Sequence, residues 1–287
     1  MSSDSDARGG AVRVLTFNLL TVRSADGPRR HEVARASMAQ LDADVVALQE
    51  VTRDPAFDQA SDLLGSGYTI LDLPGANREF GGECLATRWP VHDVVELDRP
   101  LADDAGTGAR AAALAAEIGV PSSGPLLVVH HKGTFHLDRE GVREQQAVAT
   151  ARFIEELVAE RPALPVVLLG DFNAGPDAAS LQFLTGRRSL DGVGVRYEDA
   201  WEAVHPDDPG HTFTPRNPLV AAGQMPLERG RRIDHILIRS GAHGPLLDAV
   251  SCRLVFDEPV DGVWASDHFG VLAELRPPDH APGTWGV

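Results

Sequence analysis

Short apolar segments rich in β-branched residues alternate with amphipathic segments along most of the chain. Alternating or continuous apolar positions are clearest at residues 11–19, 44–48 and 165–169. Such runs, bounded by Gly, Pro, Asn or Asp, predict buried strands. Further strands are predicted at residues 68–71, 83–87, 110–118, 126–131, 232–238, 250–255 and 269–275.

Apolar residues at helical spacing predict two long helices, at residues 28–43 and 143–160. Residues 110–118 are rich in alanine, which favours helix, but the hairpin-like context around Pro121 and Pro125 favours a strand. Because strands and helices interleave, we expect α/β layers in one domain. Shorter helices are expected at residues 57–64, within 174–190 and at 197–204, and loops at 72–82, 98–108 and 206–231.

We assign residues 11–276 to this domain, residues 1–10 to a disordered leader and residues 277–287 to a C-terminal tail. The leader is polar and lacks the apolar centre of a secretory signal. No apolar run reaches about 18 residues, so no membrane span is expected.

Polar side chains occur where the predicted strands end. Buried polar groups are costly unless they are satisfied, and ligand sites of layered α/β proteins form where strand ends converge. Six such sets along one chain therefore indicate a site. They are Asn18, Glu50, His130 with His131, Asp171 with Asn173, Asp234 with His235, and Ser266 with Asp267 and His268.

The stretch Gly170-Asp171-Phe172-Asn173 is central to this hypothesis. Period two along an extended backbone points Asp171 and Asn173 in one direction and turns Phe172 back to the core. An acid beside a neutral amide suits the handling of a polarised water and an anionic oxygen. Alone, the stretch favours an ordinary strand-end turn over a site.

The residue types fit together chemically. Carboxylates and an amide are hard oxygen ligands, which favour Mg²⁺ or Mn²⁺ over a thiolate–imidazole zinc site. Neighbouring histidines suit proton transfer or the stabilisation of an anionic transition state. An acid at the metal with a separate His–Asp pair would activate water at phosphorus.

Composition narrows the function further. With 287 residues and 43% hydrophobic content the chain can bury a large core. The net charge of −16 argues against a broad basic surface for duplex DNA, without excluding a local basic cleft. The two cysteines, Cys84 and Cys252, favour reduced thiols in a cytoplasmic protein.

The ordered set of these motifs resembles the endonuclease/exonuclease/phosphatase superfamily of DNase I-like and exonuclease III-like metal-dependent phosphoesterases. Each motif alone is weakly specific, but together they extend over nearly the whole chain. They are residues 15–19 (LTFNL), 49–50 (QE), 82–90 (GECLATRWP), 170–173 (GDFN), 232–236 (RIDHI) and 266–268 (SDH).

The resemblance implies an α/β (α+β) four-layer sandwich, with two mostly antiparallel sheets face to face and helices on both outer faces. It implies that Glu50 is the principal metal ligand, assisted by Asn18 and Asp267. Asp171 would position and polarise the attacking water or a leaving oxygen. Asn173 would hold the phosphate, His268 would be the catalytic histidine, and Asp234 would orient it.

One departure from the family pattern concerns the central strand. The family commonly has Asn-Thr-His-Leu there, whereas this chain has Val129-His130-His131-Lys132. We align His131 with the phosphate-contacting histidine, because it leaves residues 126–129 as an unbroken apolar run. A one-residue slip would make it His130, whose side chain would then point to the other face.

Two loop arginines, Arg78 and Arg110, are candidate substrate-binding residues. Each could grip a phosphate bidentately or be a solvated arginine. Arg143 and Gln146 match a softer family pattern (R-x-x-Q), and they could brace the site or face water.

We therefore predict a Mg²⁺- or Mn²⁺-dependent phosphate-ester hydrolase that acts by in-line attack of activated water. A small phosphorylated metabolite or head group is favoured slightly over nucleic acid, because the sequence lacks a basic stripe interleaved with aromatics. The alternatives are a DNA or RNA nuclease and, in another class, a catalytically silent scaffold on this fold. No protein partner is predicted.

Overall fold

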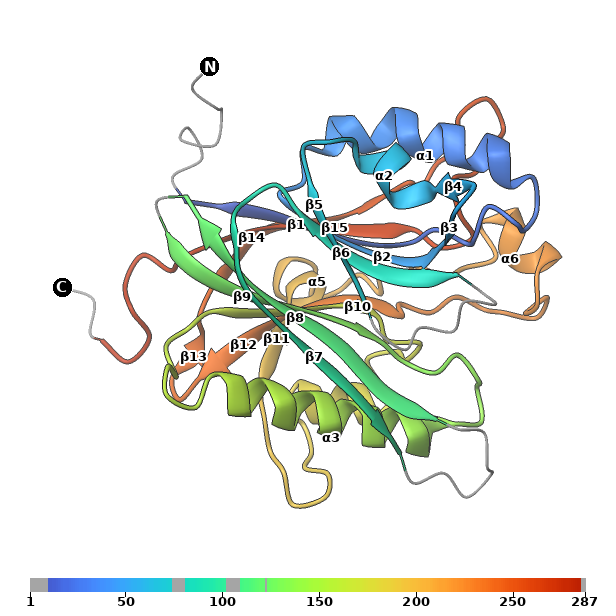
Figure 1. Ribbon diagram of the computed structural model, residues 1–287. Helices are drawn as coiled ribbons and strands as arrows, with labels where there is room; N and C mark the ends of the chain where they lie inside the picture. The colour runs from blue at the N-terminus through green and yellow to red at the C-terminus, as the bar shows by residue number, and fades with distance from the viewer. Residues whose placement is uncertain (1–9, 74–80, 102–108, 122, 285–287) are drawn as a thin grey trace.

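Two β-sheets lie face to face in the computed structural model, which describes residues 10–73, 81–101, 109–121 and 123–284 (Figure 1). The first sheet has the strand order β14-β15-β1-β2-β6-β5 and the second the order β11-β12-β10-β9-β8-β7. The first comprises β14 (Asp248–Val255), β15 (Gly270–Arg276), β1 (Val12–Asn18), β2 (Val45–Val51), β6 (Gly82–Thr87) and β5 (Thr69–Asp72). The second comprises β11 (Tyr197–Asp199), β12 (Asp234–Gly241), β10 (Val166–Asp171), β9 (Gly124–Lys132), β8 (Arg110–Val120) and β7 (Val91–Pro100).

Helices cover the outer face of each sheet (Figure 1). Helices α1 (Gly27–Leu41) and α2 (Gln59–Leu64) pack on the first sheet through a core that includes Phe17, Met38 and Leu48. Helices α3 (Glu140–Leu157) and α4 (Ala179–Leu184) pack on the second sheet. Short elements complete the described chain: β3 (Arg53–Asp54), β4 (Phe57–Asp58), α5 (Ala200–Val204), α6 (Pro218–Ala222) and β13 (Gly244–Pro245).

The predicted four-layer α/β sandwich is confirmed. Each sheet contains one parallel pair, β1 with β2 and β9 with β10, and the other neighbours pair antiparallel. A parallel pair needs a crossover connection, and α1 and α3 provide these two crossovers. The alanine-rich residues 110–118 are a strand, as predicted, and pair with β7 on one side and β9 on the other.

Some predicted elements differ from those in the structure. Residues 98–100, predicted as loop, belong to β7, whose side chains are mostly exposed and therefore lack the apolar alternation of a buried strand. Residues 197–199, predicted as the start of a helix, form β11 before α5 begins. The predicted leader falls on residues 1–9, outside the described residues, and on Gly10. The last strand ends at Arg276.

Strand alternation separates the two faces of each sheet. Even-numbered residues of β1, β9, β12 and odd-numbered residues of β2, β10, β15 point into the layer between the sheets. Val14, Val128, Leu169 and Ile236 belong to this inter-sheet core. At the strand ends the same positions are polar, so the layer that begins as an apolar core ends as a polar site.

The helices of the described part of the chain include none with the length and apolar character of a membrane span.

Arg30 of α1 fixes the loop that follows β1. Its buried guanidinium donates to the carbonyls of Leu19, Leu20, Thr21, Ser24 and Ala25, and to Ala265 before β15. Leu20 and Ala25 have positive φ angles of 47° and 22°, conformations that cost free energy and persist only when their surroundings hold them. Arg30 therefore ties the loops after Asn18 and before Asp267 to one helix.

We expect Arg30→Met to lower the free energy of unfolding by roughly 3 kcal/mol, because several buried carbonyls lose their donor. Arg29→Met is the matched control: Arg29 is the neighbouring arginine, is largely exposed, and pairs with Asp26 three residues earlier. It should change stability by less than about 0.5 kcal/mol. Urea denaturation of both variants measures this difference, and equal stabilities would contradict the role of Arg30.

Candidate active site

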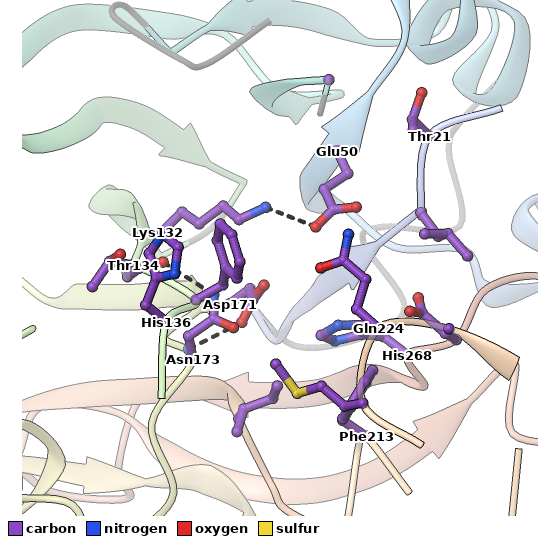
Figure 2. A pocket seen from close by; sticks show the side chains of 18 of the residues that line it. Thr21, Glu50, Lys132, Thr134, His136, Asp171, Asn173, Phe213, Gln224 and His268 are labelled. Carbon is purple, nitrogen blue, oxygen red and sulfur yellow. Dashed lines mark hydrogen bonds and ion pairs between the residues drawn. The ribbon is translucent and has the colours of Figure 1, made fainter. Parts of the chain in front are cut away.

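A pocket of about 580 Å³ opens at the polar end of the inter-sheet layer (Figure 2). Its charged lining contains Glu50 and Glu83 from the first sheet, Lys132 and Asp171 from the second, and Asp267 and His268 from the loop before β15. Both sheets therefore contribute to one site, and Glu50, Asp171, Asn173, Asp267 and His268 of the predicted strand-end set line it.

Strand register places Asp171, Lys132 and Asp234 side by side. Asp171 pairs with Lys132 of β9 and with Asp234 of β12. Residues paired across neighbouring strands point to the same face. Phe172 turns the other way into the core under α3, as predicted, while Asp171 and Asn173 line the pocket.

Glu50 reaches the pocket through an irregularity in β2. In a regular strand it would share the outer face with Leu48, which packs under α1. Instead the pairing of β2 with β6 shifts between Leu48 and Val51, and Glu50 has a φ of 57°. A β-bulge of this kind re-aims a side chain. Gly81 leaves room for it, since a Cβ there would lie 2.5 Å from the carbonyl carbon of Glu50.

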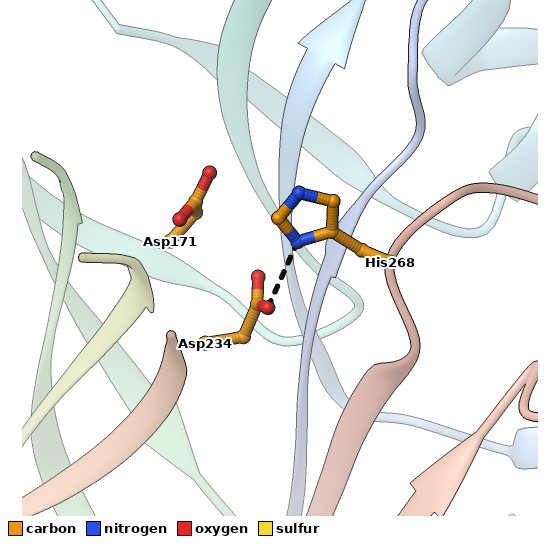
Figure 3. A group of neighbouring side chains, drawn as sticks. All are labelled: Asp171, Asp234 and His268. Atoms are coloured by element: carbon orange, nitrogen blue, oxygen red, sulfur yellow. Dashed lines mark hydrogen bonds and ion pairs between the residues drawn. The ribbon is translucent and has the colours of Figure 1, made fainter. Parts of the chain in front are cut away.

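His268 and Asp234 form a buried pair opposite Asp171 (Figure 3). The Nδ1 of His268 lies 2.9 Å from Asp234 Oδ2. Ligand atoms of Asp171, Asp234 and His268 all lie within 4.8 Å of one another. The pair orients the imidazole ring, whose other nitrogen lies on the side away from Asp234 (Figure 3).

Asn18 holds two carboxylates in place. Its amide nitrogen donates to Glu50 Oε1 at 3.0 Å and to Asp171 Oδ2 at 3.1 Å. Its oxygen accepts from the N–H of Leu20 at 3.0 Å. In this arrangement Asn18 presents nitrogen rather than oxygen to the site, so a role as a direct metal ligand would require its amide to rotate.

The donor set fits a hard divalent cation. Five carboxylates gather here (Glu50, Glu83, Asp171, Asp234 and Asp267), and Lys132 and His268 oppose them at close range. Asp234 Oδ1 is buried and has no hydrogen-bond partner among the described residues. Buried acids of this number need a cation or protons to offset their repulsion.

The local charges shift several pKa values. Burial and the Asp234 carboxylate raise the pKa of Asp171 to about 6. Burial alone would lower the pKa of His268, but the Asp234 carboxylate raises it to about 10. Burial opposes ionisation of Glu50, yet Lys132 and Asn18 lower its pKa overall. His268 is therefore a cation at neutral pH, held in this state mainly by its contact with Asp234.

The prediction for His131 is wrong about its position. His131 points under α3, where its Nδ1 lies 3.2 Å from Thr150 Oγ1 and its ring packs on Phe172. His130 points between the sheets, but deeper, against Gln49. Lys132, one residue further, takes the expected place in the pocket. Residues 126–129 are buried on both faces, so their apolar run could not fix the parity.

The two candidate arginines have different outcomes. Arg78 lies outside the described residues. Arg110 lines the pocket, and its exposed guanidinium pairs with Asp98 at 2.6 Å.

Arg143 and Gln146 brace the loop after β9. Gln146 accepts a hydrogen bond from the N–H of Thr134, and Arg143 donates to the carbonyls of Thr134 and His136.

Sequence reasoning missed three contributors to the pocket. Lys132 directly follows two histidines that are more usual catalytic residues, and Glu83 belongs to the strand motif at residues 82–90. An apolar wall, formed by Phe213, Val220 and Met225 around α6, arises in a segment predicted as loop. Lys132 and Glu83 are charged residues within or at the end of predicted strands, which was the available signal. The direction of their side chains depends on strand register, which the sequence does not give.

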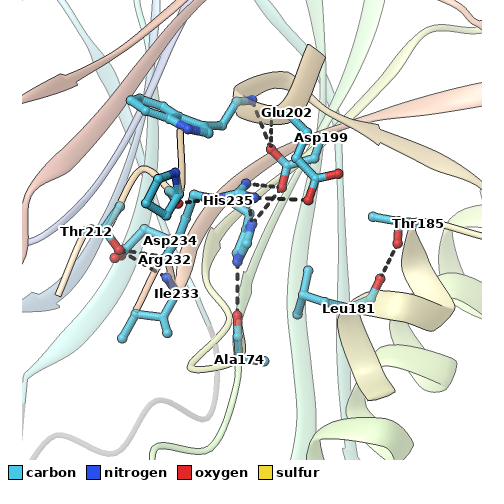
Figure 4. Close-up of polar contacts among 12 residues, drawn as sticks. Ala174, Leu181, Thr185, Asp199, Glu202, Thr212, Arg232, Ile233, Asp234 and His235 are labelled. Carbon is cyan, nitrogen blue, oxygen red and sulfur yellow. Dashed lines mark hydrogen bonds and ion pairs between the residues drawn. The ribbon is translucent and has the colours of Figure 1, made fainter. Parts of the chain in front are cut away.

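A second buried network supports the loop that carries Asn173 (Figure 4). Asp199 pairs with Arg232 and lies 2.8 Å from Nδ1 of His235. The Nε2 of His235 lies 3.0 Å from the carbonyl of Ala174. His235 thus faces away from the pocket and ties the end of β10 to β12.

Comparison with known proteins identifies the fold and its family. A sequence model of the Endonuclease/Exonuclease/phosphatase family matches residues 15–268. Comparison with curated proteins gives no match.

Solved structures resemble the chain over nearly its whole length. D. rerio TDP2 complexed with single-strand DNA product has a TM-score of 0.71 at 18% identity, covering 92% of this chain and 98% of that one. The human Nocturnin catalytic domain with bound sulfate has a TM-score of 0.70 at 18% identity, covering 94% and 95%. A Bacteroides thetaiotaomicron family protein has a TM-score of 0.71 at 19% identity, covering 96% and 98%. At these identities the similarity shows the fold.

We expect Asp199→Asn to destabilise the protein by roughly 3 kcal/mol at pH 7, because the buried Arg232 loses one of its two anionic partners and keeps Glu202 at 3.1 Å. Asp191→Asn is the control, since Asp191 is mostly exposed and pairs with Arg152 on the surface; its effect should be below about 1 kcal/mol.

The effect of Asp199→Asn should depend on pH. Burial would raise the pKa of Asp199, but His235 and Arg232 lower it to about 2. A depressed pKa stabilises the fold above the unfolded value of about 4, and this contribution is lost as pH falls toward 2. Denaturation at several pH values should show the gap between wild type and Asp199→Asn narrowing below pH 4, and a constant gap would refute it.

Proposed function

The chain belongs to the Endonuclease/Exonuclease/phosphatase family, and from this premise we propose that it hydrolyses a phosphate ester with the help of a divalent metal ion. The observation that supports this most strongly is the convergence of Asp171 with the Asp234–His268 pair at a pocket lined by further acids. In this arrangement Asp171 can act as a base toward a water molecule, and the His268 cation can stabilise a negative charge that develops on the substrate.

Glu50 and Asp267 would hold the metal ion, with Asn18 assisting after rotation of its amide. Mg²⁺ or Mn²⁺ suits these oxygen donors. When bound, such an ion polarises a phosphoryl oxygen and makes a bound water more acidic. Asp267 belongs to the same loop as His268, so metal and imidazole would be positioned together.

The chain's own residues have distinct tasks in the proposed reaction. Asp171 accepts a proton from the attacking water, whose oxygen forms a bond to phosphorus as the ester P–O bond breaks. The leaving oxygen departs with the bonding electron pair and takes a proton from solvent. His268, oriented by Asp234, stabilises the negative charge on the phosphoryl group.

Asn173 would hold the phosphoryl group of the substrate. Its backbone N–H donates to Asp171 Oδ1 at 3.0 Å, and its side-chain nitrogen donates to the carbonyl of Gly133 at 3.0 Å. The first bond holds the backbone of Asn173, and the second orients its side-chain amide. We assign the second hydrogen of the amide to a substrate oxygen.

The pocket supports a small ester rather than a long nucleic acid as substrate. Phe213, Val220 and Met225 form an apolar wall beside the charged residues, which suits an alcohol portion that carries little charge. The net charge of −16 opposes the binding of a polyanion.

Both cysteines are buried and free, which supports the proposed cytoplasmic location.

We expect Asp171→Asn and His268→Gln each to lower the turnover of bis-p-nitrophenyl phosphate with Mg²⁺ by about 10²–10⁴-fold, because each removes one acid–base or charge-stabilising group. Asp177→Asn, an exposed acid six residues after Asp171, is the control and should keep wild-type turnover. Release of nitrophenolate measures the rate. Near-wild-type turnover in either site variant would overturn the assigned roles.

A comparison of substrates separates the proposed small-ester activity from the nuclease alternative. Phosphorylated metabolites and oligonucleotides should be screened side by side with wild type and Asp171→Asn. We expect the small esters to be cleaved faster. Plasmid nicking at catalytic protein levels, with a steep decline as salt rises, would instead identify a nuclease.

A further inference from the structure

Lys132 lies among the acids at the end of β9, and the proposed reaction assigns it no task. Its ammonium donates to Glu50 Oε1 at 3.1 Å and lies 3.9 Å from Glu83 Oε1. Asp171 is its neighbour across the β9–β10 pairing. The side chain lines the pocket together with Glu50 and Asp171 (Figure 2).

The two oxygens of Glu50 have different surroundings. Oε1 receives hydrogen bonds from Lys132 and from Asn18. Oε2 has no hydrogen-bond donor among the described residues and remains available to a metal ion. One carboxylate can therefore bridge an ammonium and a divalent ion, as a bridging carboxylate joins the two ions of a two-metal site about 3.5–4 Å apart.

Among the residues that the structure describes, Glu83 forms an ion pair with Lys132. It lies on the inward face of β6, is mostly buried, and its Oε1 is 3.9 Å from the ammonium of Lys132. Burial and the neighbouring acids raise its pKa to about 7. If Lys132 were absent, three acids would form a cluster able to attract a further cation: Glu50, Glu83 and Asp171.

We propose that Lys132 is a built-in second cation, which occupies the place of a second divalent ion and restricts the site to one metal. This inference rests on the proposed metal-dependent function and deepens it. Lys132 shares Glu50 with the metal, so its charge also weakens metal binding. The ammonium and a divalent ion held by the same carboxylate would lie a few ångströms apart, where like charges repel strongly even at an effective dielectric constant of about 20.

Titration with Mn²⁺ alone, without substrate, tests this proposal. Isothermal calorimetry or the electron paramagnetic resonance signal of free Mn²⁺ gives the stoichiometry and affinity. We expect one ion per wild-type chain. Lys132→Met should bind a second ion, or bind the first at least about tenfold more tightly, while Lys132→Arg should resemble wild type because it keeps the charge.

A double variant tests whether any change in Lys132→Met comes from the lost charge or from loss of the fold. Lys132→Met leaves a surplus of buried acids, and the added Glu83→Gln change removes one of them. The double variant should therefore fold, as judged by circular dichroism, and bind one ion with an affinity closer to wild type than that of Lys132→Met.

The outcomes separate this inference from the proposed function. Two ions in the wild type, or unchanged stoichiometry and affinity in both Lys132→Met and the double variant, would overturn the role of Lys132 while leaving metal dependence intact. No Mn²⁺ binding by wild type at millimolar concentrations would overturn metal dependence and this inference together.

Discussion

The buried carboxylates at the end of the inter-sheet layer must be offset by positive charge, and much of the structure serves this requirement. Five acids converge where two apolar sheets end. Lys132 and the Asp234-bound His268 supply part of the compensation from the protein itself. The surplus of negative charge favours a divalent ion, so the same imbalance that costs stability would create the affinity for metal.

The fold delivers these groups through connections that hold strand ends together. The two parallel pairs, β1 with β2 and β9 with β10, place Asn18 near Glu50 and Lys132 beside Asp171. Buried hydrogen bonds then fix the loops that leave those strands. Arg30 binds the loop after Asn18, Gln146 the loop after Lys132, and His235 the loop after Asn173. The site is thus preorganised by groups that do not line its reactive centre.

Sequence reasoning succeeded where side-chain direction follows a local rule. Period two correctly turned Asp171 and Asn173 to the pocket and Phe172 to the core. The direction of Glu50 could not be derived in this way, because a bulge in β2 reverses it and only the family resemblance pointed to this residue. The parity of β9 was equally hidden, because residues on both faces of it are apolar. The pairing of Asp199 with Arg232 and His235 joins residues more than thirty positions apart, which no local pattern reveals.

The central claim is that water attacks phosphorus in an ester bound at this site. Hydrolysis of bis-p-nitrophenyl phosphate in ¹⁸O-labelled water, with Mg²⁺ present, tests it most directly. We expect mass spectrometry to find one ¹⁸O atom in the p-nitrophenyl phosphate product and none in the p-nitrophenol. Label in the p-nitrophenol would show attack at carbon and would contradict the account.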